Sequence, residues 1–310
     1  MQTNHPIFLH AGFRTGGTAL AFAFRELSNY RMFYDPLSTL LEARKLDYEP
    51  NSWNSNHPNS YPYFKEYKEF IDEYLNLVPS MHKLRFDFSG TITNKIFFEA
   101  ISYLISQTER ESKQAVFKFE TSEGRIAALR DEFPNGIHIG LIRNAEAQQD
   151  SWDRMRREGE YGFYYSAWKL IASSKDDFKK QAKISYFLNS LNTNEIFQIY
   201  EGVRRSKLKS CDLVIDISKP SDLKKLDKLL GLDSAIASQL ERLKAESLHR
   251  SRINKSIQRE QVISHQPDRE LSAFFSKAKC LLKRSYLASR ILRLKGFIFR
   301  DYKDVEFSNS

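Results

Sequence analysis

The chain has 310 residues and a formal net charge of +9, and 41% of its residues are hydrophobic and 28% charged. This composition is typical of a globular protein and argues against disordered, collagen-like and membrane-spanning classes. The two cysteines are too few for a disulfide framework, and the first residues do not resemble a secretory signal. We therefore expect a cytoplasmic protein without a membrane span.

Short apolar segments alternate with longer helix-forming segments along the chain. The predicted buried strands are residues 6–11, 114–119, 136–142 and 213–217. The predicted helices are residues 18–27, 94–107, 122–132, 145–157, 161–173, 195–206, 221–230 and 234–247. Strands that alternate with helices favour an α/β fold with a mostly parallel sheet and helices on both faces.

Two parts of the chain stand outside this pattern. An aromatic-rich stretch at about residues 30–110 is interpreted as an insert in an α/β domain of residues 1–247. Almost all of the net charge lies C-terminal to residue 240, and we expect residues 248–310 to form a basic helical extension. A basic segment attracts polyanions, but this one has no zinc-finger, RRM or helix-turn-helix signature, so nucleic acid is not an expected partner.

The segment HAGFRTGGTAL places a turn directly between a predicted strand and a predicted helix. Free amide groups and the helix dipole at such a turn favour a bound anion, and Gly16 and Gly17 let the backbone approach phosphate oxygens. The spacing from Gly12 to Gly17 is that of a nucleotide P-loop, but Thr18 stands where that motif requires Lys. Arg14 offers a cation inside the loop instead. A glycine-rich turn without a ligand is the alternative interpretation.

A second anion site is indicated by the segment IHIGLIRNAEAQQDSW. It places Arg143 at the end of a predicted strand and Ser151 eight residues later in the next helix. Eight residues return nearly to the same face of a helix, so both side chains can reach one phosphate. The alternative is an arginine paired with a surface carboxylate and a serine that faces water.

Together these motifs resemble those of sulfotransferases that use 3′-phosphoadenosine 5′-phosphosulfate (PAPS). FRTGGTAL resembles the 5′-phosphosulfate loop of that family, and the Arg-x7-Ser spacing resembles its 3′-phosphate site. The matching residues are Arg14, Thr15, Gly16, Thr18, Arg143 and Ser151, while Gly17 replaces a usual Thr. FYDPL at residues 33–37 resembles the family's FYEPL, and the similarity covers about residues 6–232.

The resemblance implies a three-layer sandwich like that of the P-loop NTPases, and transfer of a sulfuryl group from PAPS to a hydroxyl acceptor without a metal, leaving PAP. It implies an in-line displacement in which Arg14 stabilises the negative charge that develops on the leaving oxygen. Lys118, at the end of a predicted strand, contacts the sulfonyl group or pairs with Glu120, and a surface lysine at the strand end is the alternative. Glu120 is the preferred general base and Asp35 its rival. For both carboxylates, an exposed or helix-capping role is the alternative.

The acceptor is expected to be a carbohydrate, because aromatic rings and arginines follow Ser151. These residues are Trp152, Tyr161, Tyr164, Tyr165 and Trp168, with Arg154, Arg156 and Arg157. Core packing is the alternative for the rings. His10 and His138 are interpreted as structural, and no metal motif is present. A P-loop kinase or NTPase and a non-enzymatic polyanion-binding protein are the rival functions, and the oligomeric state is left open.

Overall fold

The computed structural model describes residues 5–46, 63–78, 80–81, 91–120, 122–157, 167, 170–171 and 193–246. For a few helix-end residues within these ranges, including 154–157, only the backbone is described. All described residues belong to one compact unit, which comprises residues 1–249. The basic helical extension expected over residues 248–310 lies outside the described residues.

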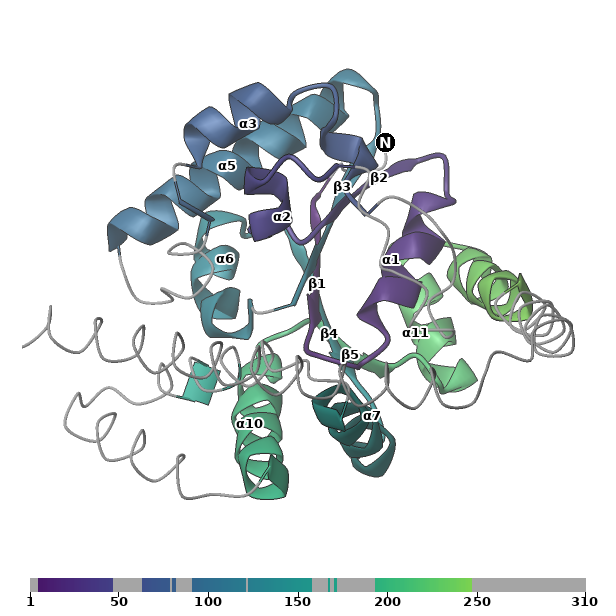
Figure 1. The fold of residues 1–310 in the computed structure, drawn as a ribbon. Helices are drawn as coiled ribbons and strands as arrows, with labels where there is room; N and C mark the ends of the chain where they lie inside the picture. Colours follow the sequence, from purple (N-terminus) through teal and green to yellow (C-terminus); the bar gives the residue numbers. More distant parts are fainter. Residues whose placement is uncertain are drawn as a thin grey trace, which may run out of the picture. The chain divides into compact units, whose positions relative to one another are not determined.

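Five strands form one sheet in the order β2-β3-β1-β4-β5 (Figure 1). The strands are β1 (Ile7–Ala11), β2 (Tyr30–Tyr34), β3 (Gln114–Phe119), β4 (Ile137–Ile142) and β5 (Leu213–Asp216). All four neighbouring pairs are parallel. The predicted α/β class with a parallel sheet is therefore confirmed. Because the strands run in one direction, the loops that follow them share one edge of the sheet.

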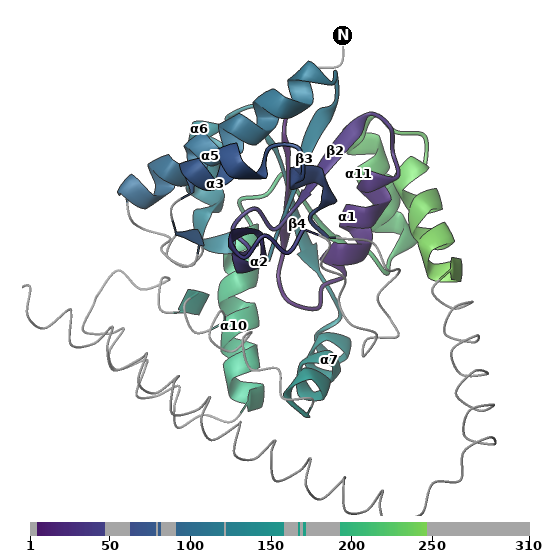
Figure 2. The ribbon, with the colours of Figure 1, turned by 45° about the horizontal axis from the view of Figure 1, so that its top comes forward.

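Helices cover both faces of this sheet. The larger ones are α1 (Gly17–Arg25), α3 (Ile71–Leu77), α5 (Thr91–Arg110), α6 (Ile126–Glu132), α7 (Ala145–Arg157), α10 (Thr193–Leu208) and α11 (Pro220–Leu230). Shorter elements are α2 (Thr39–Glu42), η1 (Lys65–Tyr67) and η2 (Glu123–Arg125), and a last described helix spans 235–246. Helices α1 and α11 lie on one face and α3, α5 and α6 on the other, while α7 and α10 lie past the carboxyl ends of the strands (Figures 1 and 2). No described helix combines the length and hydropathy that a bilayer crossing requires.

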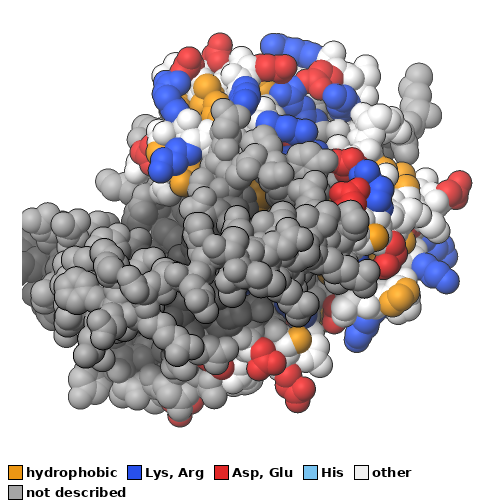
Figure 3. All heavy atoms as spheres, turned by 45° about the vertical axis from the view of Figure 1, so that its right-hand side comes forward, with side chains coloured by type: hydrophobic (Ala, Val, Ile, Leu, Met, Phe, Trp, Pro, Cys, Tyr) orange, Lys and Arg blue, Asp and Glu red, His pale blue; other side chains and the backbone are white. Residues whose placement is uncertain are grey.

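The described surface carries charges of both signs. On the face shown in Figure 3, basic and acidic side chains are interspersed over the coloured part of the molecule. Many of them pair with one another, as in the contacts of Arg130 with Asp212 and of Lys225 with Asp222, both 2.8 Å.

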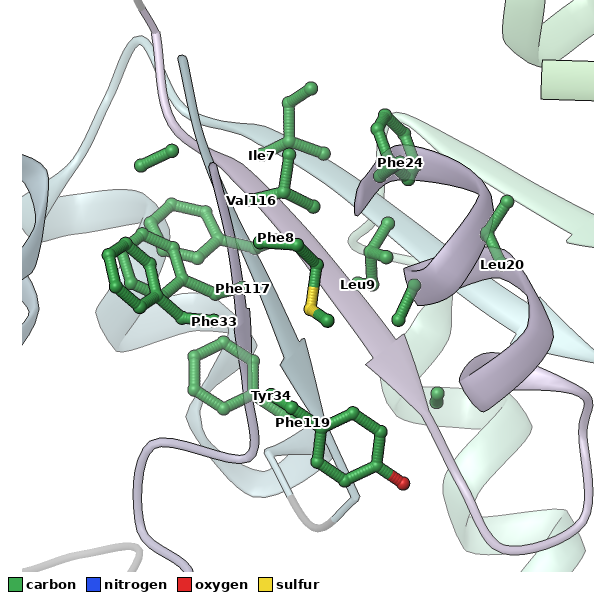
Figure 4. Packing of buried hydrophobic residues seen from close by; sticks show 14 of the residues in the cluster. Ile7, Phe8, Leu9, Leu20, Phe24, Phe33, Tyr34, Val116, Phe117 and Phe119 are labelled. Atoms are coloured by element: carbon green, nitrogen blue, oxygen red, sulfur yellow. The ribbon is translucent and has the colours of Figure 1, made fainter. Parts of the chain in front are cut away.

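The strand β1 is buried along its whole length because helices cover both of its faces. Leu9 points with Leu20 and Phe24 toward the α1 side, while Phe8 points to the opposite side (Figure 4). There the Phe8 ring stacks on Phe117 with 5.5 Å between centroids. Burial of one such side chain contributes about 1.5–3 kcal/mol, so this double-faced packing fixes the strand that leads into the glycine-rich loop.

The aromatic stretch at residues 30–110 differs from the insert expected from the sequence. It begins with β2, which pairs with β3 from Tyr30 opposite Gln114 to Tyr34 opposite Lys118. Its buried rings belong to the main core: Tyr30, Phe33, Tyr34, Tyr63, Phe64, Tyr67, Phe70 and Tyr74. The described part of this stretch is thus a sheet edge with its covering helices, because its large apolar rings are buried in the same core as the sheet.

Candidate functional site

The loop of residues 12–16 joins β1 to α1 at the carboxyl edge of the sheet. Thr15 is buried, and its Oγ1 donates to the carbonyl oxygen of Gly12 at 2.8 Å, which closes the turn. Arg14 has a φ of 63° and Gly16 a φ of 87°. Only glycine adopts this left-handed conformation at little cost, so the loop holds a strained backbone at Arg14, the predicted ligand-binding residue.

The first turn of α1 has a glycine N-cap and no side-chain cap. The amides of Ala19 and Leu20 donate to the carbonyl oxygen of Gly16. The three preceding amides, of Gly16, Gly17 and Thr18, have no acceptor among the residues that the structure describes. An α-helix that begins with unsatisfied amides is suited to bind an anion, because the amides and the helix dipole both favour negative charge.

Packing also requires the two loop glycines. A Cβ atom on Gly17 would lie 2.3 Å from the Cβ atom of Ala11, and one on Gly16 would lie 2.4 Å from Cδ1 of Ile217. The sequence motif favours phosphate approach as the reason for these glycines. The structure adds a second reason, since the start of α1 lies directly on the end of β1.

Arg14, Ser151 and Arg143 meet beside this helix start, as the proposed phosphate sites require. The Nε of Arg14 donates to Ser151 Oγ at 2.6 Å, and Nη1 of Arg143 donates to the carbonyl oxygen of Arg14 at 3.2 Å. Arg143 directly follows β4, and Ser151 lies in α7. Three residues predicted from two separate motifs are thereby brought to one place.

Residues of α7 that the sequence analysis did not single out fix this helix against the loop. Asn144 Oδ1 accepts the amide of Ala147 at 3.1 Å and so caps the helix. Gln148 is fully buried, and its Nε2 donates to the carbonyl oxygen of Phe13 at 2.8 Å. Gln148 precedes Ser151 by three residues, so its position on the same helix face was readable from the sequence.

Helix α10 contacts both candidate anion sites through two adjacent arginines. The buried Arg204 donates from Nη1 to the carbonyl oxygen of Leu141 at 2.7 Å, and its Cδ would lie 2.6 Å from a Cβ atom on Gly12. Arg205 donates from Nη2 to the carbonyl oxygen of Arg143 at 3.1 Å. Helix α10 thus contacts the ends of both β1 and β4. No sequence signal marked these arginines, because charges on a helix usually face water.

Two glutamates balance the charge of Arg204. Its Nε lies 2.9 Å from Glu201 Oε2, and its Nη1 lies 3.9 Å from Glu123 Oε1. That oxygen of Glu123 is buried without a hydrogen-bond partner among the described residues. Burial raises the pKa of Glu123 to about 7, although the charge of Arg204 opposes the rise. This buried cluster lies behind the loop and holds it in place.

A second group of side chains lies on the α1 side of β2 and β3. The Nζ of the buried Lys118 donates to Glu120 Oε1 at 2.8 Å and to Tyr34 Oη at 3.0 Å. The Tyr34 hydroxyl also contacts Glu120 Oε1 at 3.2 Å and Thr18 Oγ1 at 3.0 Å. Of the two roles considered for Lys118, the structure shows the pairing with Glu120. Tyr34 was missed from the sequence because it reads as one more ring of an aromatic stretch.

Asp35 follows β2 and lies in a different environment from Glu120. It is buried with a φ of 38°, and its amide donates to the carbonyl oxygen of Lys118 at 2.7 Å. Burial, and after it the charge of Asp35, raise the pKa of Tyr74. Asp35 therefore lies near a buried tyrosine of the core, whereas the half-buried Glu120 is joined to the first turn of α1 through Tyr34. This difference favours Glu120 as the base.

His10 and His138 form a buried pair between β1 and β4. His10 Nε2 lies 3.0 Å from His138 Nδ1, and His10 Nδ1 lies 2.7 Å from Ser122 Oγ. Burial lowers the pKa of both rings, to about 4 for His138. Within the described ranges, no group of three His, Cys, Asp or Glu side chains is arranged to hold a metal ion.

The described residues do not show an exposed group of aromatic rings that could bind the acceptor. Trp152 is buried, and its ring packs on Phe197 and Tyr200 at 5.2 and 5.3 Å between centroids. This contact matches the alternative of core packing. The other expected acceptor residues lie outside the described residues or have undescribed side chains: Tyr161, Tyr164, Tyr165, Trp168, Arg154, Arg156 and Arg157.

No protein-family model matches the chain, and no curated protein matches it in sequence. The candidate site combines a helix start with unsatisfied amides, two arginines with a serine beside it, and a Lys-Glu-Tyr cluster that contacts Thr18 in the first turn of α1.

Proposed function

We propose that this chain is a PAPS-dependent O-sulfotransferase with a P-loop NTPase-like fold. The observation that carries the proposal is the meeting of Arg14, Ser151 and Arg143 beside the first turn of α1. PAPS has phosphate groups at both its 5′ and 3′ positions, so a protein that binds it needs two adjacent anion sites. The unsatisfied amides of α1 suit the first site, and the pair of Arg143 and Ser151 suits the second.

The charges of the site support an anionic ligand. Arg143 is half-buried and has no carboxylate within ion-pair distance among the described residues, and its one described acceptor is the carbonyl oxygen of Arg14. A guanidinium keeps its charge at any physiological pH and matches phosphate oxygens with two parallel donors. A guanidinium whose one described hydrogen bond goes to the loop carbonyl oxygen of Arg14 leaves several donors for a bound phosphate.

In the proposed reaction, the bond between sulfur and the bridging oxygen of the 5′-phosphosulfate breaks, and a bond forms between sulfur and the acceptor oxygen. Arg14 stabilises the charge that develops on the bridging oxygen, and the amides of Gly16, Gly17 and Thr18 hold the 5′-phosphate. Glu120 takes the proton of the acceptor hydroxyl. PAP leaves, so atoms and charge balance without a metal in the step.

The acceptor is proposed to be a hydroxyl compound of the carbohydrate class. This part of the proposal follows from the sequence, since the residues that suggest a glycan lie largely outside the described ranges. A screen of mono- and oligosaccharides with radiolabelled PAPS tests it separately from donor binding.

Calorimetric titration with PAP and with ATP tests the donor site. We expect PAP to bind more tightly than ATP, with or without Mg²⁺, because only PAP has a 3′-phosphate. Arg143→Ala should weaken PAP binding at least tenfold, as expected for the loss of charge-assisted hydrogen bonds. Arg130→Ala is the matched control, since Arg130 pairs with Asp212 and does not contact the loop. Tighter binding of Mg²⁺-ATP than of PAP would favour the kinase or NTPase instead.

A further inference from the structure

The Tyr34 hydroxyl is a junction between the glycine-rich loop and the Lys118–Glu120 pair. Tyr34 is buried at the end of β2, and its Oη lies 3.0 Å from Thr18 Oγ1, 3.0 Å from Lys118 Nζ and 3.2 Å from Glu120 Oε1. Thr18 belongs to the first turn of α1, Lys118 lies near the end of β3, and Glu120 directly follows that strand. One phenol therefore contacts the proposed phosphate site and the proposed base.

Counting donors and acceptors fixes the direction of these hydrogen bonds. Lys118 has only donors, and an ionised Glu120 has only acceptors. The phenol stays protonated, because burial, and after it the charge of Glu120, raise its pKa well above the ordinary value. It has one proton, which goes either to Glu120 or to Thr18. With the proton on the Glu120 side, Tyr34 Oη accepts from Lys118 and Thr18, so every group of the cluster is satisfied.

An anion at the start of α1 changes this arrangement. The Thr18 hydroxyl then donates to the anion and no longer to Tyr34, and its oxygen becomes an acceptor. The Thr18 oxygen can then accept the Tyr34 proton, and this turn of the phenol would leave Glu120 Oε1 with Lys118 as its donor in the cluster. A carboxylate that has lost one donor accepts a proton from a substrate hydroxyl more readily.

We infer that Tyr34 is a positioning residue that couples anion binding at the loop to the hydrogen bonding of Glu120. The inference rests on the proposed function, because it takes the phosphate of PAP as the anion and Glu120 as the base. Its consequence is that the base is readied only when the donor site is filled. By linkage, anion binding and release of the Tyr34 proton by Glu120 favour each other, so a change that weakens the hold of Glu120 on this proton should strengthen anion binding.

A double-mutant cycle with PAP as the probe tests this coupling. Calorimetry gives the PAP dissociation constant of the wild type, Glu120→Gln, Tyr34→Phe and the double variant. Loss of the Glu120 charge changes PAP affinity by direct electrostatics whether or not residue 34 is Tyr. It changes PAP affinity through the Tyr34 hydroxyl only in the proteins that retain Tyr34. We expect Glu120→Gln to tighten PAP binding by about threefold more in the wild type than in Tyr34→Phe. An equal effect in both backgrounds would overturn the coupling.

Three further variants separate the coupling from a general effect on folding. Thr18→Val should abolish the coupling without changing the core, and Thr18→Ser should keep it because the hydroxyl remains. Tyr67→Phe should also keep it, since the Tyr67 hydroxyl donates only to the backbone oxygen of Tyr34, at 3.4 Å. Loss of the coupling in Thr18→Ser or Tyr67→Phe would contradict the inference. A wild type that does not bind PAP at all would overturn the proposed function itself, which is a different result from PAP binding without coupling.

Discussion

Arg14 donates from Nε to Ser151 Oγ at 2.6 Å, across 137 residues of sequence. The contact joins the loop after β1 to the second turn of α7, and therefore joins the two motifs that the sequence assigns to opposite ends of one ligand. Because the contact is direct, the loop after β1 and the second turn of α7 lie side by side. The proposed ligand has two anionic groups, and this arrangement suits it better than a ligand with one anionic group.

Ser151→Ala removes the hydroxyl from this junction. We expect it to weaken PAP binding by about tenfold, because a hydrogen bond between the hydroxyl and a charged group is lost. Ser151→Thr should retain most of the affinity. The control is Ser106→Ala on α5, where the hydroxyl donates to the backbone oxygen of Tyr103. Calorimetry gives the PAP dissociation constants of the wild type and the three variants. An unchanged affinity in Ser151→Ala would show that Ser151 does not belong to the 3′-phosphate site.

Gly17→Ala tests the packing role of the loop glycines. The new methyl group would meet the Cβ atom of Ala11 at 2.3 Å, so β1 and α1 must move apart. We expect a loss of about 1–3 kcal/mol in the free energy of unfolding, as in other overpacked sites, with a lower melting temperature. The matched control is Gly202→Ala in α10, where a Cβ atom meets nothing within 4 Å. That variant should gain up to about 1 kcal/mol from helix propensity. Equal stability of Gly17→Ala and the wild type would show that the loop is not tightly packed.

Sequence reasoning located the strands that are apolar throughout and the loop between β1 and α1, because burial on both faces leaves a continuous apolar run. It missed β2, since this edge strand carries Arg31 between aromatic residues and so has no clear pattern. It predicted that Arg14, from its place in the loop, and Arg143 and Ser151, from their spacing, serve one ligand, and the structure brings these three residues together. It did not identify Tyr34 or Arg204, whose importance comes from contacts between distant segments that no local pattern encodes.

The buried Glu123 should give the protein a pH-dependent stability. Burial raises its pKa from 4.5 to about 7 in the folded state, despite the opposing charge of Arg204. Between these values the folded protein binds more protons than the unfolded chain, so the free energy of unfolding falls as the pH rises. The Glu123 contribution to this fall is up to about 3 kcal/mol. The free energy of unfolding in urea, measured at pH 5 and pH 7.5, should therefore fall less with rising pH in Glu123→Gln than in the wild type.

The control for Glu123 is Glu132→Gln at the end of α6, where the side chain is exposed. It should keep the pH dependence of the wild type. If Glu123→Gln shows the same fall in stability as Glu132→Gln between the two pH values, then Glu123 does not bind the extra proton in the folded state.

The histidine pair should make the fold sensitive to acid, with the opposite sign. Burial, and after it the charge of Arg130, lower the pKa of His138 from 6.5 to about 4, while Asp212 opposes the change. The unfolded chain then binds more protons below pH 6.5, so stability is complete above that pH and falls as the pH decreases toward 4. His138→Gln should weaken this fall by up to about 3 kcal/mol, because the glutamine stays neutral.

The two dependences partly cancel in the wild type, since Glu123 stabilises the folded state at low pH and His138 destabilises it there. The contributions of Glu123 and His138 are separated by comparing the free energy of unfolding of each variant with that of the wild type at each pH. His5→Gln is the control for His138, because His5 lies just before β1 and is only partly buried. Urea unfolding between pH 4 and 6.5 should give parallel curves for His5→Gln and the wild type, and a flatter curve for His138→Gln. Parallel curves for all three proteins would mean that the folded state tolerates a charged His138, against the burial that the structure shows.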